Sequence, residues 1–242
     1  MDEIVTLETR PGVRQSFLLA TEGGVRPEVV VLMFPGGPGV VGLPADVNHM
    51  ARGPVFVLRA LDRFRDREVG LAIVDAPSDQ RDGMEDGFRS GRQHAQDIAG
   101  VVDYLERRFP SSRLFLLGTS RGTVSAAHLG RALGTRIDGV VLASTVFSGT
   151  RRYMGLRDFD FRSIAAPLLF VHHAQDKCFL CPYAAARELG EKYPLITVQG
   201  GRVAESDECG PLSAHGYYGR EAETVAAIKD WMLGRPYPSV VN

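Results

Sequence analysis

The chain is poor in the features that mark several broad classes of protein. Its 242 residues include three cysteines and one tryptophan, and its formal net charge at pH 7 is -1. So few cysteines exclude a disulfide scaffold, and their odd number leaves at least one thiol outside any bridge within the chain. Because basic residues are not in surplus, neither a nucleic acid nor an anionic membrane is expected as a partner.

Long hydrophobic runs are absent as well. The longest continuous apolar stretches, such as Val29–Phe34, are far shorter than the roughly 20 residues that a membrane-spanning helix needs. The first ten residues, MDEIVTLETR, are acidic and contain no apolar signal core. The sequence as it stands therefore predicts a cytoplasmic protein. An exported or periplasmic protein would require a trimmed signal peptide and paired cysteines.

The sequence does contain a regular alternation of apolar runs and helical patterns. This alternation predicts an α/β protein, in which a mostly parallel sheet is covered by helices on both faces. No linker, repeat or low-complexity tract interrupts it, so residues 1–242 are expected to form a single domain with one irregular insertion at 146–163. The expected strands are 3–9, 14–20, 28–34, 69–77, 113–118, 137–144, 167–173 and 194–200, and the expected helices are 55–67, 90–109, 123–133, 182–193 and 220–233.

The segment FLLGTSRGTVSAA, residues 115–127, contains a Gly-x-Ser-x-Gly pentad around Ser120. Ser120 follows an expected strand and precedes an expected helix, which is the context of a nucleophile elbow. Glycines at 118 and 122 would remove Cβ atoms that crowd a strained serine. The N–H of Arg121, at the start of the helix, would stabilise an oxyanion. The alternative is a helix-capping serine in an ordinary Gly-flanked turn.

A nucleophilic serine needs a base and an orienting acid, and both are expected on later loops. Of the six histidines, His215 is the one that lies between the last expected strand and the closing helix. Asp176 follows the strand at 167–173, so the order Ser120, Asp176, His215 is the one expected for a serine nucleophile on a parallel sheet. Weaker candidates for the acid are Asp158, Asp160 and Asp207.

The loop FPGGPG, residues 34–39, follows the strand at 28–34. Its glycines allow the backbone to approach a substrate closely, and the N–H of Gly37 is a candidate second oxyanion donor. A simple Gly/Pro turn is the alternative. With the pentad, the aspartate and the histidine, this loop predicts a serine hydrolase. Ser120 would attack an ester carbonyl, His215 would act as the base, and Asp176 would orient His215.

These motifs resemble those of the α/β-hydrolase family. PGGPG looks like its oxyanion loop and GTSRG like its elbow, while Asp176 and His215 match the positions of its acid and base. FPGG, VDAPSD, GTSRGTVSAA, VHHAQDKCFLCP and AHGYYGRE are similar to a group of small bacterial hydrolases of mostly unassigned substrate, near the dienelactone-hydrolase type. The resemblance runs from about residue 3 to residue 233. It implies about eight strands, hydrolysis of an ester or related acyl compound, and no cofactor.

Two departures from the family pattern matter. Pro35 stands where many relatives carry histidine, which leaves the geometry of the oxyanion loop open. The insertion at 146–163 is short where larger relatives carry a cap, so an open site or a minimal lid is expected. PGGPG also looks like the HGGPG of proline iminopeptidases. Those enzymes carry a large cap for which this chain has no room, so aminopeptidase activity is not expected.

The cysteines admit three interpretations. A disulfide between Cys209 and either Cys178 or Cys181 would tie the acid loop to the base loop, and Cys178–Cys209 is slightly favoured. Three free thiols in a cytosolic enzyme are an alternative of similar weight. A metal site built from Cys178, Cys181 and the pair His172 and His173 is disfavoured, because adjacent strand side chains point to opposite faces. No metal is therefore expected.

Further candidates surround the expected site. The side chains of Arg121 and Tyr217 are candidate substrate contacts, and Arg121 would alternatively pair with a carboxylate such as Asp75. The mixed charges of residues 59–68 are expected to form a solvated helix face. A small-molecule ester is the expected partner, and the oligomeric state is left open. The competing functions are a non-catalytic binding or sensor protein on the same fold, and an acyltransferase or amide hydrolase.

Overall fold

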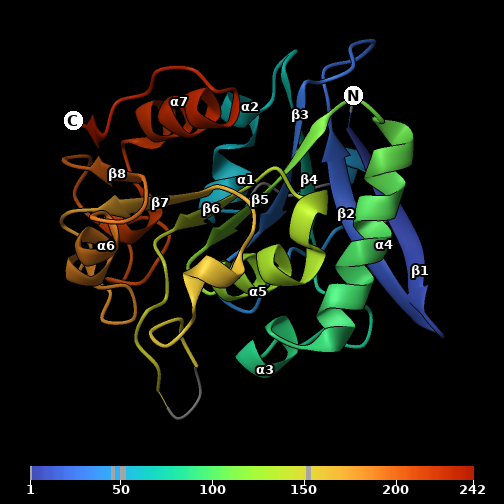
Figure 1. Cartoon of the computed structure of the whole chain (residues 1–242), viewed down its shortest axis with the longest axis horizontal. Helices are drawn as coiled ribbons and strands as arrows, with labels where there is room; N and C mark the ends of the chain where they lie inside the picture. The colour runs from blue at the N-terminus through green and yellow to red at the C-terminus, as the bar shows by residue number, and fades with distance from the viewer. Residues whose placement is uncertain (1, 45–46, 50–52, 151–153) are drawn as a thin grey trace.

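The computed structural model describes residues 2–44, 47–49, 53–150 and 154–242. Within these residues, the chain forms a sheet of nine strands in the order β1-β2-β4-β3-β5-β6-β7-β8-β9 (Figure 1). The pairs β1–β2 and β2–β4 are antiparallel, and every other neighbouring pair is parallel. The strands are β1 (Asp2–Arg10), β2 (Val13–Ala20), β3 (Val29–Phe34), β4 (Val69–Val74), β5 (Arg113–Thr119), β6 (Gly139–Ala143), β7 (Leu168–His173), β8 (Leu195–Val198) and β9 (Val240–Val241).

Helices cover both faces of the sheet. Helices α1, α2 and α7 lie on one face, and α4 and α5 lie on the other (Figure 1). The α-helices are α1 (Phe56–Arg59), α2 (Leu61–Phe64), α3 (Asp86–Arg89), α4 (Arg92–Arg108), α5 (Gly122–Leu133), α6 (Tyr183–Leu189) and α7 (Glu221–Met232). Short 3-10 helices are η1 (Val47–His49), η2 (Gly134–Arg136), η3 (Phe161–Ser163) and η4 (Ala214–Gly216).

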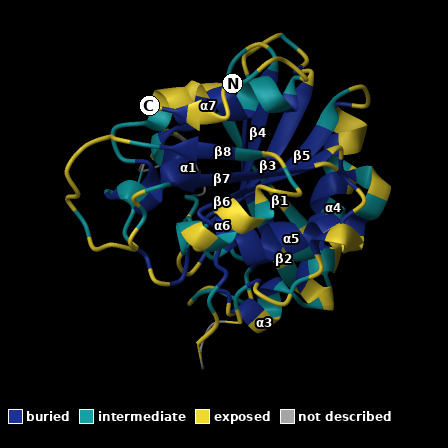
Figure 2. Cartoon of the chain, turned by 60° about the vertical axis from the view of Figure 1, so that its left-hand side comes forward, coloured by how far each residue is buried: buried dark blue, intermediate teal, exposed yellow. Residues whose placement is uncertain are grey.

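The central strands are apolar on both sides because both faces are covered. Every residue of β3 is buried, and its side chains alternate between two apolar clusters. Val30, Leu32 and Phe34 face α4 and α5, whereas Val29, Val31 and Met33 face α1, α2 and α7. Figure 2 shows the resulting pattern, in which the strands are buried and the outer surfaces of α4 and α7 are exposed.

The structure confirms the expected α/β architecture and refines it. All eight expected strands are present, with ends that differ from the expected ones by at most three residues. The ninth strand, β9, contains two residues and gives no sequence pattern of its own. The helical stretch expected around 55–67 is present, but it is shorter and interrupted. Two four-residue helices occupy that segment, and Ala60 ends the first and begins the second. Helix α3 was not expected either, since four residues are too few to show a helical period.

The described part of the insertion at 146–163 packs against the body of the protein. The N–H groups of Phe147 and Ser148 donate to the Leu180 carbonyl at 2.9 and 3.1 Å. Leu156 is fully buried, and Phe161 begins η3 as another buried residue. Residues 151–153 of this insertion lie outside the described residues. No helix in the described part of the chain has the length and apolar character needed to cross a bilayer.

Helix α5 begins in close contact with the sheet, and this contact depends on Gly122. A Cβ atom at Gly122 would overlap the Phe34 carbonyl oxygen of β3, and a Cβ atom at Gly118 would overlap the Gly122 carbonyl. These are contacts with backbone atoms, which cannot move aside as the end of a flexible side chain can. The two glycines therefore set the distance between helix and sheet.

We predict that Gly122→Ala lowers the free energy of unfolding by about 3 kcal/mol or more, because the added methyl group must displace β3 or α5. Gly87→Ala is the matched control, since a Cβ there meets nothing within 4 Å. We expect the control to change stability by about 1 kcal/mol at most. Urea unfolding followed by circular dichroism measures both, and equal midpoints for the two variants would contradict the close contact.

Candidate active site

The candidate residues come from loops at the carboxyl edge of the parallel strands, where ligands bind in open α/β sheets. Gly37 follows β3, Ser120 and Arg121 follow β5, and Asp176 follows β7. His215 lies in η4, after β8. Gly37, Ser120 and His215 line one cavity with a volume of about 200 Å³. The fold thus brings residues together from segments that are far apart in sequence.

Ser120 adopts a backbone conformation that is rare for a residue with a side chain. Its φ angle is 52°, in the left-handed region. The surrounding backbone holds it there, since its N–H donates to the Ala143 carbonyl at 2.9 Å and its own carbonyl accepts from the Thr123 N–H at 2.8 Å. This conformation costs on the order of 1–3 kcal/mol and persists where neighbouring structure enforces it. The conformation is the one expected for a nucleophile elbow.

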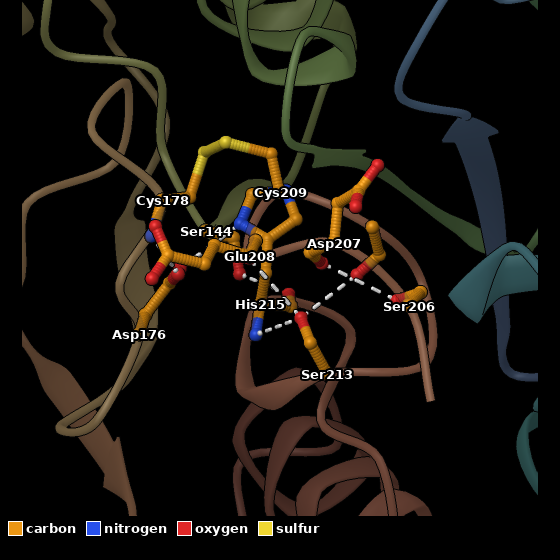
Figure 3. Close-up of a disulfide and its surroundings, with 10 residues drawn as sticks. Ser144, Asp176, Cys178, Ser206, Asp207, Glu208, Cys209, Ser213 and His215 are labelled. Carbon is orange, nitrogen blue, oxygen red and sulfur yellow. Dashed lines mark hydrogen bonds and ion pairs between the residues drawn. A yellow bond between two sulfur atoms is a disulfide. The ribbon is translucent and has the colours of Figure 1, made fainter. Parts of the chain in front are cut away.

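His215 and Asp176 form a buried pair. His215 Nδ1 lies 2.9 Å from Asp176 Oδ2, and both side chains are almost completely buried (Figure 3). The other carboxylate oxygen, Asp176 Oδ1, accepts the Cys178 N–H at 2.8 Å. The Ser144 hydroxyl donates to the His215 carbonyl at 2.8 Å, and the His215 N–H donates to Ser213 Oγ at 3.1 Å. Contact with the carboxylate through Nδ1 leaves Nε2 available for proton transfer.

No hydrogen bond joins His215 to Ser120 among the described residues, although both line the same cavity. Catalytic hydrogen bonds are often long before substrate binds. Among the described residues, the carboxylate that contacts the His215 ring is that of Asp176, whereas the three weaker candidates for the acid, Asp158, Asp160 and Asp207, are exposed. Asp160 instead accepts from the Arg162 N–H at 3.1 Å, at the start of η3.

The loop at 36–39 passes directly beside Ser120. A Cβ atom at Gly36 would lie 2.9 Å from Ser120 Cβ, so the loop could not come as close with a larger residue. Three carbonyl groups in this loop, those of Gly36, Gly37 and Pro38, each have a donor. The Gly39 N–H donates to the Gly36 carbonyl at 3.1 Å, the Arg89 guanidinium to the Gly37 carbonyl at 3.1 Å, and the Met84 N–H to the Pro38 carbonyl at 2.9 Å. Gly37 has a φ angle of 57° and lines the cavity.

The Arg121 side chain is held away from the cavity. Its Nε and Nη2 atoms donate to Asp86 Oδ1 at 3.0 and 2.9 Å, and Nη2 also donates to the Met84 carbonyl at 3.1 Å. Arg121 thus pairs with a carboxylate, as the alternative interpretation expected, but that carboxylate belongs to Asp86 and not to Asp75. The Asp75 carboxylate accepts the backbone N–H groups of Val41 and Leu43 at 2.6 and 2.9 Å. Arg121 does not appear in the described lining of the cavity, whereas its backbone begins α5.

Tyr217 does line the cavity, next to His215. Its side chain is 1% exposed, and its hydroxyl donates to the Val171 carbonyl at 2.7 Å. Burial raises the pKa of Tyr217, so this hydroxyl stays protonated. The Tyr217 hydroxyl is therefore engaged in a hydrogen bond within the protein.

Arg59 is a residue of the site that sequence reasoning missed. Its Nη2 donates to the Gly216 carbonyl at 2.7 Å, its Nη1 to the Pro211 carbonyl at 3.2 Å, and its Nε to Glu221 Oε1 at 2.9 Å. The expectation of a solvated helix face at 59–68 is thus wrong for Arg59, which holds the loop that carries His215. No pattern in the sequence signals this contact, because the two partners are more than 150 residues apart.

Arg89 is a second such residue. Its side chain is 1% exposed, and its guanidinium contacts backbone carbonyls and a hydroxyl. Burial lowers the pKa of Arg89, the Arg121 charge lowers it further, and the Asp86 charge opposes both. Burial of this cation therefore carries an unfavourable desolvation free energy.

The cysteines lie beside Asp176 and His215, the candidate acid and base. Cys178 and Cys209 form a disulfide that links the Asp176 loop to the segment preceding His215 (Figure 3). Cys181 is free and fully buried. Burial raises the pKa of the Cys181 thiol well above its usual range, the Asp176 charge raises it further, and a hydrogen bond to the Ser120 side chain opposes both. Cys181 is therefore close to the proposed nucleophile, and its thiol is protonated near neutral pH.

The histidines of the disfavoured metal site have other partners. His172 Nε2 accepts the Thr145 N–H at 3.0 Å, and burial lowers the pKa of His172 to about 3. His173 Nε2 lies 2.8 Å from the Gly200 carbonyl, and burial lowers the pKa of His173 as well. Neither ring converges with Cys178 and Cys181 in the described structure, in which the cysteine sulfurs group with His215 instead.

Known proteins share the fold that carries these residues. Residues 78–197, which include Ser120 and Asp176, match the family described as "Serine aminopeptidase, S33". No curated protein matches the chain. Est1E from Butyrivibrio proteoclasticus, solved with ferulic acid bound, is similar over 96% of this chain and 98% of its own, with a TM-score of 0.67 and 13% identity.

Two further solved structures have the same fold. Dienelactone hydrolase from Anabaena variabilis is similar over 97% of this chain and 98% of its own, with a TM-score of 0.64 and 12% identity. A serine hydrolase without a lid from Xanthomonas campestris is similar over 93% of this chain and 94% of its own, with a TM-score of 0.60 and 14% identity. The chain thus has the fold of these α/β hydrolases along nearly its whole length, and residues 78–197 match a family model of the α/β serine hydrolase type.

We predict that the disulfide stabilises the folded chain by about 3–4 kcal/mol, because it closes a loop between residues 31 positions apart. In urea unfolding, a dithiol reductant should lower the stability of the wild type by this amount. The double variant C178S/C209S should have the reduced stability and should not respond to the reductant. Equal unfolding midpoints for the oxidised wild type and the double variant would contradict a stabilising bridge.

Proposed function

We propose that this protein is a carboxylic ester hydrolase that works through an acyl-enzyme on Ser120. The observation that carries the proposal is a serine with a φ angle of 52° that lines the same cavity as His215, whose ring forms a buried pair with Asp176. A non-catalytic binding protein would have no need of a strained serine next to a base. The match to a serine hydrolase family over residues 78–197 supports the same assignment.

The proposed reaction has two halves. In the first, Ser120 Oγ attacks the ester carbonyl and His215 Nε2 takes the hydroxyl proton, while Asp176 orients the ring and stabilises its charged form. The backbone N–H groups of Gly37 and Arg121 donate to the oxyanion. His215 then returns the proton to the departing alcohol. In the second half, His215 activates water, which releases the acid from Ser120 through the same oxyanion site.

The cavity favours a short, uncharged substrate. Its volume is about 200 Å³, below the roughly 300–1,000 Å³ of drug-sized ligand pockets. Apart from the polar groups of the proposed triad and loop, the described lining is mostly apolar, with Val41, Phe56 and Leu58 among its members. No acidic or basic side chain other than His215 occurs in that described lining. Short apolar esters therefore fit better than charged ones.

We predict that Ser120→Ala lowers kcat for short-chain p-nitrophenyl esters by about 10⁶-fold, the scale on which loss of a triad nucleophile acts. Asp176→Asn should lower kcat by about 10⁴-fold, because His215 would be held in the wrong tautomer. The wild type should prefer acetate and butyrate esters to dodecanoate. Retention of wild-type hydrolysis by Ser120→Ala would exclude this mechanism.

A fluorophosphonate probe separates the competing functions. Rapid labelling of Ser120 in the wild type, and none in Ser120→Ala, is the expected result for an activated serine. Absence of labelling would favour a ligand-binding protein on this fold. Comparison of p-nitrophenyl esters with amino-acid p-nitroanilides, with and without an added alcohol, separates ester hydrolysis from amide hydrolysis and acyl transfer. The p-nitroanilides are included because the matched family is described as a serine aminopeptidase family.

A further inference from the structure

Arg89 is the largest of the fully buried side chains in the described part of the chain. It ends α3, and its guanidinium donates to three uncharged acceptors. These are the Met84 carbonyl at 3.3 Å, the Gly37 carbonyl at 3.1 Å and the Ser125 hydroxyl oxygen at 3.1 Å. A buried cation without a directly bonded carboxylate is a poor way to stabilise a fold, since an apolar residue would avoid the cost of desolvation. The contacts therefore call for a reason other than stability.

Two of the three contacts, those with Gly37 and Ser125, join the two segments that carry the proposed oxyanion donors. Gly37 belongs to the loop after β3, and Ser125 belongs to α5, which begins directly after Arg121. A glycine-rich loop is flexible by itself, because glycine populates many backbone conformations. Since a guanidinium is planar and rigid, one Arg89 side chain bonded to Gly37 and Ser125 fixes the loop relative to the helix.

We propose that Arg89 is a positioning residue for the oxyanion site, which sets the separation between the N–H groups of Gly37 and Arg121. The inference rests on the proposed function and adds to it a residue that touches neither the substrate nor the reacting atoms. Gly39 is consistent with this role, because a Cβ atom there would overlap the Arg89 guanidinium. The space beside Arg89 is therefore closed to any larger residue at that position.

The test uses Arg89→Met, which keeps the length of the side chain and removes its donors. We expect kcat to fall by about 100-fold while KM changes by less than about threefold, because loss of one oxyanion donor acts mainly on the transition state. The affinity for a trifluoromethyl ketone, whose adduct with Ser120 carries an oxyanion, should fall by a similar factor. Arg136→Met is the matched control, since Arg136 is a partly exposed arginine that pairs with Asp103 and Glu106.

Chemical rescue separates positioning from a loss of fold. Addition of guanidinium ions at about 10 mM should restore part of the kcat of Arg89→Ala, and the same concentration of sodium chloride should not. Arg89→Lys, which keeps one cationic donor, should fall between Arg89→Met and the wild type. Wild-type kcat in both Arg89→Met and Arg89→Lys would overturn the inference. So would a decrease in thermal stability that accounts for the loss of activity in every variant, with no rescue.

The proposed function can fail separately. A wild type that neither hydrolyses esters nor reacts with the fluorophosphonate contradicts the ester hydrolase and the role of Arg89 together. An active wild type whose Arg89 variants keep full kcat contradicts the role of Arg89 alone.

The cysteine cluster carries a second inference, independent of the first. The sulfurs of Cys178 and Cys181 and a ring nitrogen of His215 all lie within 4.8 Å of one another. The Cys181 N–H donates to the Cys178 carbonyl at 2.9 Å, which closes a β-turn with the two cysteines at its ends. The Cα atoms at the ends of such a turn are less than about 7 Å apart, which overlaps the range of about 4.4–6.8 Å found across disulfides. Cys178 can therefore pair with Cys181 as well as with Cys209.

We infer that Cys178, Cys181 and Cys209 form a thiol–disulfide exchange site. The Cys181 sulfur, after losing its proton to His215, attacks Cys178 Sγ. The Cys178–Cys181 bond forms as the Cys178–Cys209 bond breaks, and the Cys209 thiolate takes the proton from His215. No electrons are gained or lost overall. Exchange would release the exposed segment around Cys209 and thereby untie the loop of Asp176 from the loop of His215.

Peptide mapping tests the exchange directly. Trypsin places Cys178 and Cys181 together in residues 178–187 and Cys209 in residues 203–220. After incubation of the folded wild type at pH 8.5 and alkylation in acid, we expect at least about a tenth of the chains to contain peptide 178–187 with an internal disulfide and an alkylated Cys209. Cys181→Ser should give the cross-linked pair of peptides alone. A wild type that gives the cross-linked pair alone, even after hours, would overturn the inference.

Discussion

The close contact between helix α5 and strands β3 and β5 is the constraint on which the site depends. Gly122 at the start of the helix lies against the Phe34 carbonyl, and Gly118 at the end of β5 lies against Gly122. With so little space between helix and strand, the chain must turn sharply at Ser120, and it does so at a φ angle of 52°. The same turn places the Arg121 N–H at the positive end of the α5 dipole. The proposed nucleophile and one proposed oxyanion donor thus both depend on one packing contact.

Arginine side chains then hold the loops that surround this turn. Arg59 donates to the carbonyls of Gly216 and Pro211, Arg89 to that of Gly37, and Arg121 to that of Met84. A guanidinium has several donors in a fixed plane, so one side chain can bind carbonyls from separate segments. None of these three arginines occurs in the described lining of the cavity. The cations thus hold the loops in place, and the cavity that they surround stays largely apolar.

The sequence was informative where a pattern repeats or where residue order is constrained by the fold. Alternating apolar runs predicted the strands, and the order Ser120, Asp176, His215 predicted three residues that the structure gathers around one cavity and its edge. Contacts made by single residues could not be predicted from the sequence. Arg121 pairs with Asp86 and not with Asp75. This partner could not be predicted, because Asp86 lies on α3, a helix too short to show a pattern in the sequence. In the same way, spacing left Cys178 and Cys181 as alternative partners of Cys209, and only the folded chain distinguishes them.

The described part of the insertion at 146–163 contributes nothing to the described lining of the cavity. Contacts among the surrounding loops hold the candidate residues in place. His215 shows how many there are: its ring contacts Asp176, its carbonyl accepts from Ser144, and its N–H donates to Ser213. Arg59 donates to the carbonyl of the next residue, Gly216, and the disulfide links the Asp176 loop to the segment that precedes His215. A site whose loops are fixed in this way can keep its dipoles and its base oriented before substrate arrives. Such preorganisation is a main source of electrostatic catalysis.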